Sequence, residues 1–419
     1  MAKYDVAVCG GGPAGIIAAV AAARNGAKTI LIEKYGFLGG MATLSLVSPI
    51  SVFNKKGKRI IAGIPLEFAE EMERLGGADT SFPSGNIHFD PEIYKLVAQR
   101  MVLGSGATLL LHSYITGCKR EGGRVTSITL ENKSGRQTLE AGYFIDCTGD
   151  ADLVKYAGFP FRIGDERKEL QPMTLWFRLG GVDTDRLENM EMRESGRRHV
   201  NTRIREKLLS LGGEVPKFGG PWMLTTLRRG EASVNMSRFA GDGTDVLSLT
   251  EAECRLREDV FRLVALLREN FEEFRNCYII DTGTQVGIRE TRRIDGLYEM
   301  TADDILSPKD FPDTIAKGGH PIDIHKPDSR EQDLRRVDEG YNIPYRTLIP
   351  KGSENLLVAG RTISATREAI ASIRVQATCM ALGQAAGTAT AICSKNNLPV
   401  GKINITELRE TLISPGAII

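Results

Sequence analysis

The apolar positions at the start of the chain fall into two short runs with a helix-like segment between them. Tyr4–Cys9 is an apolar run of strand length, and Lys28–Ile32 is a second one. Between them, the alanine content and the helical spacing of apolar positions predict a helix over Ile16–Asn25, which Gly26 ends. The order strand, helix, strand indicates the opening of a parallel sheet that is covered by helices.

The turn between the first strand and the helix carries the glycine spacing GxGxxG, in the sequence GGGPAG at positions 10–15. The first glycine permits a tight turn, the second lets the backbone approach a pyrophosphate, and the third lets helix and strand pack closely. Glu33 closes the second strand, where a carboxylate accepts hydrogen bonds from ribose hydroxyls. The pattern predicts a Rossmann-like α/β domain with a dinucleotide site. The residues expected there are Gly10, Gly12, Pro13, Ala14, Gly15, Glu33 and Lys34.

Later apolar runs extend this domain to the other end of the chain. Three β-rich runs between residues 107 and 139, separated by glycine turns, predict a small antiparallel meander attached to the parallel sheet. A strand at 143–147 ends in a Thr-Gly-Asp turn, and a buried strand at 355–358 precedes a small-residue helix over 373–395. The cofactor domain is therefore expected to be discontinuous, with residues 1–160 and 346–419 as its two parts.

The middle of the chain has a different pattern. Strands are predicted at 176–179 and 232–236, and a charged amphipathic helix at 250–270 with Thr250 as its N-cap. We interpret residues 161–345 as an inserted α+β substrate or cap domain. Ligand pockets favour the junction between two such domains, so we expect the substrate there.

Composition and charge exclude several classes of function. The chain carries 54 lysines and arginines against 53 acidic residues, so no charge excess favours nucleic acid or an anionic membrane as a partner. Seven scattered cysteines, never spaced as CxxC, argue against a zinc ribbon or a redox pair and favour reduced thiols in a cytoplasmic protein. No run approaches the ~18 apolar residues of a membrane span. The sequence leaves homo-oligomer formation open, and no metal site is expected.

Eight stretches resemble one known family: GGGPAG (10–15), IEKYGFLGGMAT (32–43), HFDPE (88–92), FIDCTGDADL (144–153), HPIDIH (320–325), NIPYRTLIP (342–350), LLVAGRTISATREA (356–369) and ATCMALGQAAG (377–387). Together they resemble the FAD-dependent oxidoreductases of the glutathione-reductase and fumarate-reductase lineage, in particular a single-chain prokaryotic subgroup. The resemblance implies FAD as the cofactor and is uninformative about the substrate.

The resemblance also implies cofactor contacts beyond the first turn. They are Gly39, Gly40 and Met41 at the ribityl chain and flavin ring, Tyr114 and Ile115 at the adenine, Thr148, Gly149 and Asp150 at a second crossing point, Gly360 and Arg361 at phosphate or ribityl, and Gln376 and Ala377 at the flavin O2 edge. A helix N-terminus at that edge suits the negative charge of reduced flavin. Arg361 departs from the family pattern, which has an acid at this position.

Three clusters are candidates for the chemistry. His320 and His325 flank an aspartate in a loop and could serve as general base and orienter, or could be structural histidines. Arg289 and Arg292 would share one face if helical and could clamp a carboxylate, or could form surface ion pairs. His88 precedes a predicted helix start and could reach the flavin, or could only contact the helix.

The sequence thus predicts an FAD-dependent oxidoreductase that transfers a hydride between a small organic substrate and flavin N5. The direction of transfer and the electron acceptor stay open. A flavin-dependent monooxygenase is the enzymatic alternative, and a non-redox binding protein on the same fold is the alternative of another class. No second GxGxxG lies between a strand and a helix, so a separate NAD(P)H domain is not expected.

Overall fold

The computed structural model describes residues 3–81, 85–187, 202–326 and 332–419. Its largest sheet has seven strands in the order β7-β2-β1-β10-β9-β8, with β21 paired to β10. The parallel part contains β1 (Tyr4–Cys9), β2 (Thr29–Ile32), β7 (Thr108–Leu110), β10 (Gly135–Asp146) and β21 (Leu356–Val358). The predicted antiparallel meander is confirmed, because β8 (Tyr114–Glu121), β9 (Arg124–Asn132) and the first half of β10 pair in this way.

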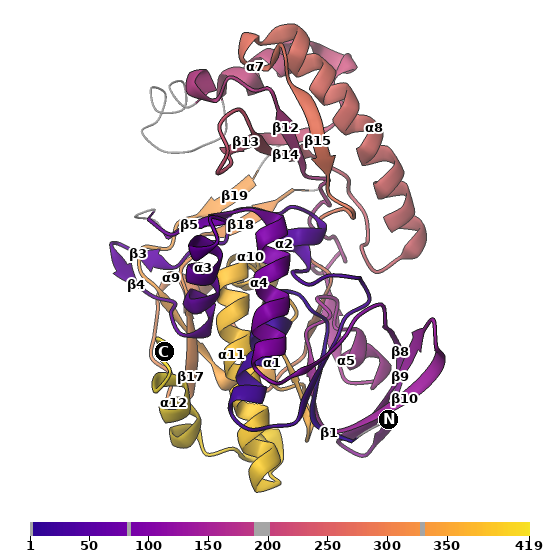
Figure 1. Cartoon of the computed structure of the whole chain (residues 1–419), viewed down its shortest axis with the longest axis vertical. Helices are drawn as coiled ribbons and strands as arrows, with labels where there is room; N and C mark the ends of the chain where they lie inside the picture. Colours follow the sequence, from indigo (N-terminus) through magenta and orange to yellow (C-terminus); the bar gives the residue numbers. More distant parts are fainter. Residues whose placement is uncertain (1–2, 82–84, 188–201, 327–331) are drawn as a thin grey trace.

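Two helices from opposite ends of the chain pack on this sheet and on each other. They are α1 (Pro13–Arg24) and α11 (Gln376–Asn396), which Figure 1 shows side by side. Small residues allow the approach, since a Cβ built on Gly383 would lie 2.1 Å from the Ala14 carbonyl oxygen. At Gly387 the corresponding distance to the Ala18 carbonyl oxygen is 2.2 Å. The small-residue composition of both helices is therefore a condition of their contact.

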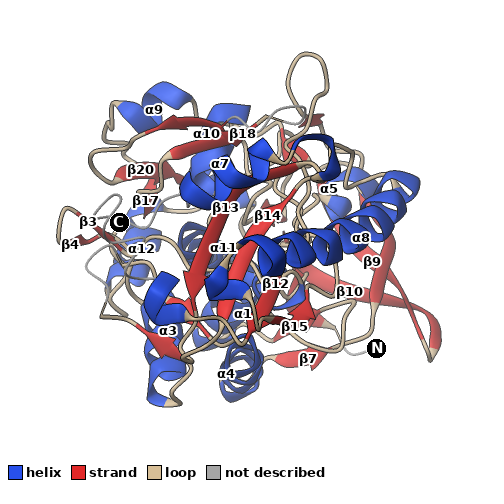
Figure 2. Ribbon diagram, turned by 90° about the horizontal axis from the view of Figure 1, so that it is seen from above, coloured by secondary structure: helices blue, strands red, loops and turns tan. Residues whose placement is uncertain are grey.

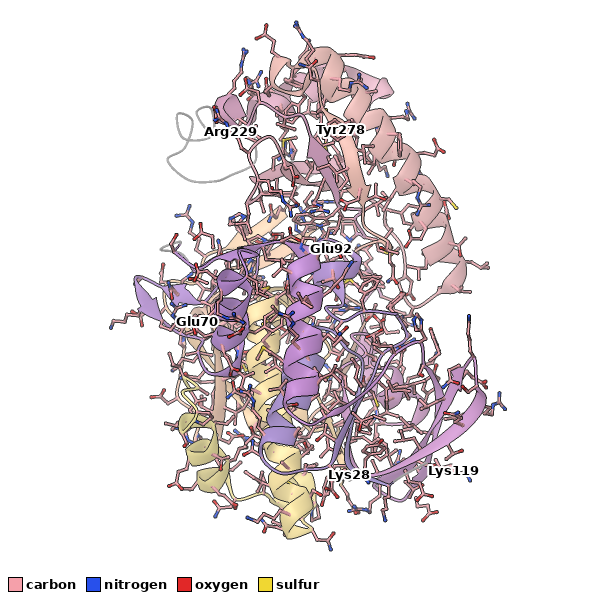
Figure 3. All side chains as sticks on the ribbon, in the orientation of Figure 1. Lys28, Glu70, Glu92, Lys119, Arg229 and Tyr278 are labelled. Carbon is pink, nitrogen blue, oxygen red and sulfur yellow. The ribbon has the colours of Figure 1, made fainter. Side chains whose placement is uncertain are left out.

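A second, four-stranded antiparallel sheet belongs to the other part of the molecule. Its order is β13-β14-β12-β15. The strands are β12 (Phe177–Gly180), β13 (Phe218–Thr225), β14 (Ala232–Ser237) and β15 (Tyr278–Thr282). One face packs against α8 (Val246–Asn270), and α7 (Thr202–Ser210) joins the same hydrophobic core. Figure 1 shows this cap at the top, and Figure 3 places Glu92, near the start of α4, just beneath it.

The remaining elements complete the cofactor part and its edges (Figure 2). The helices are α2 (Met41–Leu44), α3 (Ile64–Arg74), α4 (Pro91–Gly104), α5 (Asp152–Tyr156), α9 (Ala302–Leu306), α10 (Arg367–Ile373) and α12 (Ile405–Ile413). The strands are β3 (Asn54–Lys55), β4 (Lys58–Arg59), β5 (Ala78–Asp79), β6 (His88–Phe89), β11 (Phe161–Ile163), β16 (Arg292–Ile294), β17 (Thr314–Gly318), β18 (Ile322–His325), β19 (Gln332–Arg335) and β20 (Tyr341–Pro344). No helix among the described ranges is long and apolar enough to cross a membrane.

The molecule has two hydrophobic cores, and the predicted insertion contributes residues to both of them. The cap core contains residues from Met173 to Ile288. Residues from Ile294 to Tyr345 belong instead to the core of the cofactor part. The strands β16 to β20 therefore lie on the cofactor part, and the domain limits at 160 and 345 stay predictions.

Two helix boundaries differ from the sequence-based expectation. The helix predicted from Thr250 begins at Val246, because Asp245 caps it by accepting a hydrogen bond from the Ser248 N–H at 2.8 Å. The Thr250 hydroxyl instead donates to the Val246 carbonyl inside the helix at 2.7 Å. The helix predicted over 373–395 is α11, which begins three residues later, at Gln376, because Ile373 still belongs to α10.

Candidate active site

The cap sheet presents a polar and aromatic face toward the cofactor part. Successive side chains of a strand point to opposite faces. On β14, Val234 and Met236 lie in the cap core, so Asn235 faces the other way. The same alternation turns Trp222 of β13 and Trp176, just before β12, to that second face.

This second face forms one wall of a cavity of about 420 Å³. The opposite wall comes from the cofactor part and includes Met41, Arg361 and Gln376, three of the predicted cofactor residues. The candidate catalytic residues that line the same cavity are His88, Arg289, His320 and His325. The structure therefore brings residues from both groups of predictions to one space.

The glycine-rich turn leaves room for a ligand where the sequence predicts a pyrophosphate. A Cβ on Gly15 would lie 1.8 Å from the Gly10 carbonyl oxygen, which accounts for glycine at that position. At Gly12, by contrast, the nearest atom to a Cβ would be the Gly40 Cα at 3.8 Å. This open side fits the close approach of a phosphate to the backbone.

Glu33 is held in place for a second partner. Its Oε2 accepts a hydrogen bond from the Gly11 N–H at 2.6 Å, and its Oε1 accepts one from the Tyr35 N–H at 3.0 Å. Burial raises the pKa of Glu33, and these backbone bonds oppose the rise. A carboxylate oxygen has two lone pairs, so each oxygen can also accept a ribose hydroxyl. With the open side of Gly12, this donor and acceptor set fits the adenosine and pyrophosphate parts of FAD.

The second predicted crossing point is organised around an ion pair. Arg361 Nη2 lies 2.7 Å from Asp150 Oδ1, and a Cβ on Gly149 would lie 3.0 Å from the Arg361 Cζ. The buried Nε of Arg361 has no hydrogen-bond partner in the described part of the chain. Thr148 bonds locally, because its hydroxyl donates to Asp146 at 2.7 Å. The Nε–H of Arg361 is thus available to a ligand, which suits an anionic or hydroxyl-bearing group.

The remaining predicted cofactor residues lie at the start of α11 and beside the meander. Gln376 Nε2 donates to the Val47 carbonyl at 2.7 Å, while its buried Oε1 has no partner among the described residues. Ala377 is fully buried behind it. Lys34 lies over the Tyr114 ring, with its Nζ 5.5 Å from the ring centroid, and Tyr114 is half exposed. Such an exposed ring beside β2 is available to an adenine.

His325 and Asp323 form the one acid-base pair on the cavity wall that the described residues contain. His325 Nε2 lies 3.3 Å from Asp323 Oδ2. Burial, followed by the charge of Arg289, lowers the pKa of His325 to about 3. Burial alone would raise the pKa of Asp323, but its hydrogen bond to His325 and the nearby Arg374 charge hold that pKa below its usual range. In this state the imidazole is neutral and the carboxylate is ionised.

The other two candidate histidines also lie at the cavity, in different surroundings. His320 Nδ1 is 2.8 Å from the Pro321 carbonyl oxygen, and burial lowers the pKa of His320. The His320 carbonyl accepts a hydrogen bond from the Ser372 hydroxyl at 2.5 Å. His88 lies on β6 and is 6% exposed. The His320 ring is therefore bonded to a backbone carbonyl oxygen, whereas the His325 ring is bonded to a carboxylate.

A pair of arginines lies beside the histidine. Arg289 Nη1 donates to the Pro172 carbonyl at 2.6 Å and to the Thr174 hydroxyl at 2.7 Å. Arg238 Nη1 also donates to the Thr174 hydroxyl at 2.7 Å, and to Asn235 Oδ1 at 3.0 Å. Arg289 keeps some accessible surface because it lines the cavity, whereas Arg238 is 7% exposed behind it. The two guanidiniums share neutral acceptors.

Within the described ranges, neither guanidinium forms a hydrogen bond or ion pair with a carboxylate. Arg238 Nη2 has no hydrogen-bond partner there. Burial lowers the pKa of Arg238 to about 9, and burial together with the Arg238 charge lowers the pKa of Arg289. Buried charges are costly unless they are paired, so this arrangement favours an anion as the partner.

Arg289 and Arg292 do not share a helical face, because the segment that carries them is not helical. Residues 283–291 form no helix, and Arg292 begins the strand β16. Its Nη1 donates to the Asp150 carbonyl at 2.8 Å and lies 2.9 Å from Asp152 Oδ1, away from the residues that line the cavity. Arg292 is therefore a structural link between β16 and the start of α5. The spacing of the arginines does not correspond to a helix, because Arg292 and the residues after it pair with β11 as a strand.

Several cavity residues were missed by the sequence analysis. They are Trp176, Trp222, Asn235 and Arg374; Arg238, which lies buried behind Arg289, was missed as well. The predicted strand at 232–236 carried a usable signal, because alternation along it marks Asn235 as the residue opposite to the core. Arg374 had no such signal, since it lies at the break between α10 and α11.

Comparison with known proteins places the whole chain in one group. A family model described as "FAD dependent oxidoreductase" matches residues 5–412. The dihydrolipoyl dehydrogenase of Trypanosoma brucei brucei is 60% identical over 177 residues, which are 39% of this chain and 33% of that protein. The digeranylgeranylglycerophospholipid reductase of Methanocella arvoryzae is 28% identical over 172 residues, 37% of this chain and 42% of that protein. Each match spans less than half of the relative's length.

A solved structure extends the comparison to the fold. The structure of a flavin-dependent brominase matches with a TM-score of 0.50 and 12% identity, over 98% of this chain and 83% of that one. At this identity the likeness concerns the fold alone. It confirms the predicted α/β fold class, with a Rossmann-like FAD-binding sheet.

Proposed function

Because the chain belongs to the family of FAD-dependent oxidoreductases, we propose that it is an enzyme that transfers a hydride between a small anionic substrate and the flavin N5 of FAD. FAD, when bound, supplies the ring that accepts or donates the hydride. The observation that carries the proposal is the arginine pair Arg238 and Arg289, which lacks a carboxylate partner in the described part of the chain and lies beside His325.

The proposed cofactor contacts follow from the fit of the open turn. Gly10, Gly12 and Gly15 take the pyrophosphate, and Glu33 the adenosine ribose. Lys34, Tyr114 and Ile115 flank the adenine, while Gly39, Gly40 and Met41 lead to the cavity. The second crossing point and the start of α11 add Thr148, Gly149, Asp150, Gly360, Arg361, Gln376 and Ala377. The unpaired atoms of Arg361 and Gln376 support this assignment, since both are buried polar groups at the cavity wall.

We assign the anion to Arg289, with Arg238 behind it. Arg289 reaches the cavity, and Thr174 fixes both guanidiniums by accepting a hydrogen bond from each. A carboxylate is the simplest organic anion that matches a guanidinium fork. Bound there, it neutralises charge that the free protein compensates only in part, through the nearby Asp323.

We assign the acid-base role to His325. Its Nε2–H is directed to the ionised Asp323, so the lone pair of the neutral imidazole is on Nδ1. A pKa of about 3 makes a weak base, and Arg289 is a main cause of that low value after burial. An anion on Arg289 removes part of the repulsion and therefore raises the pKa of His325 toward the working range. Substrate binding thus prepares the residue that takes or gives the substrate's proton.

His88 and His320 complete the cavity wall beside these groups. We propose that they shape the pocket near the cofactor and that His325 carries the acid-base role. Arg292 is excluded from the proposal because its guanidinium is bound to Asp152 outside the cavity lining. The non-redox alternative is disfavoured by membership of an enzyme family.

The lineage and the type of flavin reaction belong to the proposal as well. We keep the glutathione-reductase and fumarate-reductase lineage as the finer assignment, and the flavin-dependent monooxygenase as the enzymatic alternative. Without a second dinucleotide turn, NADH and NADPH are expected to bleach the flavin poorly in stopped-flow absorbance. Rapid and saturable bleaching by either one would favour the monooxygenase.

The direct test is anaerobic reduction of the bound flavin. The purified holoenzyme is mixed with a panel of small carboxylates and with their neutral alcohol or amide analogues. The visible absorbance of the oxidised flavin is followed. Bleaching by one or more carboxylates, without bleaching by the matched neutral compound, is the expected result. Reduction by neutral compounds alone would overturn the proposal.

A further inference from the structure

The two tryptophans of the chain are in the same place. The sequence contains only two, Trp176 and Trp222, and both line the cavity between the cap sheet and the cofactor part. Trp176 is 6% exposed. The apolar core of the cap lies on the opposite face of the sheet, so core packing does not explain two large indole side chains on this face.

The strand register sets the spacing of these two side chains. Trp222 of β13 pairs with Asn235 of β14, and Phe177 of β12 pairs with Val234 on the other side of β14. Continuing that register by one residue puts Trp176 beside Asn235. Asn235 therefore lies between the tryptophans. With neighbouring strands about 4.8 Å apart, their backbones are separated by roughly 10 Å.

The anion site lies at the base of this pair. Asn235 Oδ1 accepts hydrogen bonds from Arg238 at 3.0 Å and from Arg289 at 3.5 Å. A carboxylate held by these guanidiniums begins next to Asn235. The carbon skeleton attached to it must then pass the side chains on either side of Asn235, which are the two indoles.

We propose that the substrate carries its anionic group on a flat, aromatic or conjugated skeleton that lies between Trp176 and Trp222. The inference rests on the proposed function, because it specifies the substrate of that same site. Van der Waals contact between carbon atoms needs about 3.5–4.0 Å on each side of a ring, or roughly 7–8 Å between two flanking faces. The roughly 10 Å between the two strands accommodates that spacing for a planar ring, whereas a puckered ring is thicker and needs more.

The neighbours of Trp222 sharpen the choice. The Arg238 guanidinium lies over the Trp222 ring, 5.0 Å from its centroid, and the His325 ring meets it edge-on at 5.3 Å. These contacts hold the indole in one orientation. They also set the proton-carrying His325 beside the surface on which the skeleton would lie, so the reacting carbon or its substituent is near the ring rather than at the end of a flexible chain.

The test compares a planar and a saturated anion of the same size. Benzoate and cyclohexanecarboxylate are titrated into the oxidised holoenzyme, with benzyl alcohol as the neutral control. Tryptophan fluorescence reports the cavity alone, because both tryptophans line it, and the flavin spectrum gives a second signal. Aromatic contacts predict that benzoate binds about threefold to tenfold more tightly than cyclohexanecarboxylate, and that benzyl alcohol binds more weakly than both.

Variants locate the effect. Trp176→Leu and Trp222→Leu should each reduce the preference for benzoate, whereas Trp176→Phe should retain part of it. Phe261→Leu, on the exposed side of α8, is the matched control and should keep the parent preference. Flavin occupancy is measured in every variant, so that loss of the fold is recognised.

The outcomes separate the two ideas. Equal affinity for benzoate and cyclohexanecarboxylate, with both binding better than benzyl alcohol, overturns the planar substrate and leaves the anionic substrate standing. Binding of benzyl alcohol as tightly as either carboxylate overturns the proposed function itself. A preference for benzoate that survives both leucine variants also overturns the inference, because the tryptophans would not be its cause.

Discussion

The cofactor side of the cavity presents mainly backbone groups to a ligand, whereas the cap side presents side chains. On the cofactor side, the turn at Gly12 offers backbone and open space, and Glu33 is held by two backbone N–H groups. On the cap side, side chains from neighbouring strands form the wall, and Asn235 and Thr174 accept hydrogen bonds from two arginines. A wall made of backbone constrains the sequence to small residues. A wall made of side chains can change its chemistry while the sheet is kept.

The largest effect is expected from filling the backbone wall. Gly12→Val should abolish FAD binding and give a colourless protein, because the side chain would occupy the space that a pyrophosphate needs. The protein itself leaves room there, with the nearest atom 3.8 Å from a Cβ, so the variant should still fold. Flavin released on denaturation measures the occupancy. Gly401→Val, at a position with no atom within 4 Å, is the control and should stay yellow. Parent-level flavin in Gly12→Val would contradict the placement.

A cap-side change should leave the cofactor bound and slow the reaction. His325→Ala is expected to reduce the rate of flavin reduction by about 10²–10⁴-fold, the usual contribution of a general acid or base. Stopped-flow reduction under anaerobic conditions measures it. His112→Asn replaces an exposed histidine outside the cavity lining and should reduce at the parent rate. Loss of FAD from His325→Ala would instead assign this histidine to the cofactor side.

The two arginines that the sequence grouped together should behave differently. Arg289→Ala should weaken the binding of an anionic substrate by about 2–5 kcal/mol, since one partner of a desolvated charge pair is removed. Arg292→Ala should lower the melting temperature through loss of its bond to Asp152, with little change in substrate binding. Substrate dissociation constants and thermal melts of both variants check this. Equal loss of substrate affinity would show that both arginines serve the site.

The smallest expected effect is on stability in acid. The folded pKa of His325 is about 3, below its ordinary value of about 6.5, so the unfolded chain binds a proton that the folded one does not. This contribution to stability is present above pH 6.5 and is lost as the pH falls toward 3. At pH 5 the loss relative to neutral pH amounts to about 2 kcal/mol. Burial raises the pKa of Asp146 to about 6, which acts in the opposite direction.

The measurement is therefore a difference between two proteins. Denaturant unfolding of the anion-free parent and of His325→Gln is compared between pH 7 and 4.5. The parent should lose more stability than the variant over this interval, because only the parent carries the imidazole. Identical slopes would show that the pKa of His325 is the same in the folded and unfolded states. A bound carboxylate should reduce the difference by compensating Arg289.

The contrast between the two walls also decides what the sequence could predict. Glycine spacing, the strand before it and the acid after it are local features, so the turn at 10–15 and Glu33 were located from the sequence. The cap wall depends on which strands become neighbours. Asn235 meets Trp222 and the register of β12 only after folding. A pattern read along one segment cannot give that pairing. The same limit applies to Arg292, whose ion pair with Asp152 forms only in the folded chain.

Some single residues of the candidate site could be identified from the sequence by their residue type. His325 and Arg289 were identified by residue type and by their place outside the cofactor segments, and both line the cavity. Arg238 and Arg374 are equally charged and equally near, but they were hidden among many arginines without a distinguishing context. Burial is what separates them from surface arginines, and burial is a property of the folded chain.

The contact between α1 and α11 has a consequence for how the protein is made in the cell. The helix that begins beside the glycine-rich turn needs its partner from residues 376–396, near the end of the chain. During translation the first strands and α1 leave the ribosome long before that partner exists, and their apolar surface waits for it. The packing around the nucleotide cradle is thus completed only after residues 376–396 have been synthesised. A chain that stops before Gln376 lacks the helix that packs on α1, so it is expected to retain FAD poorly.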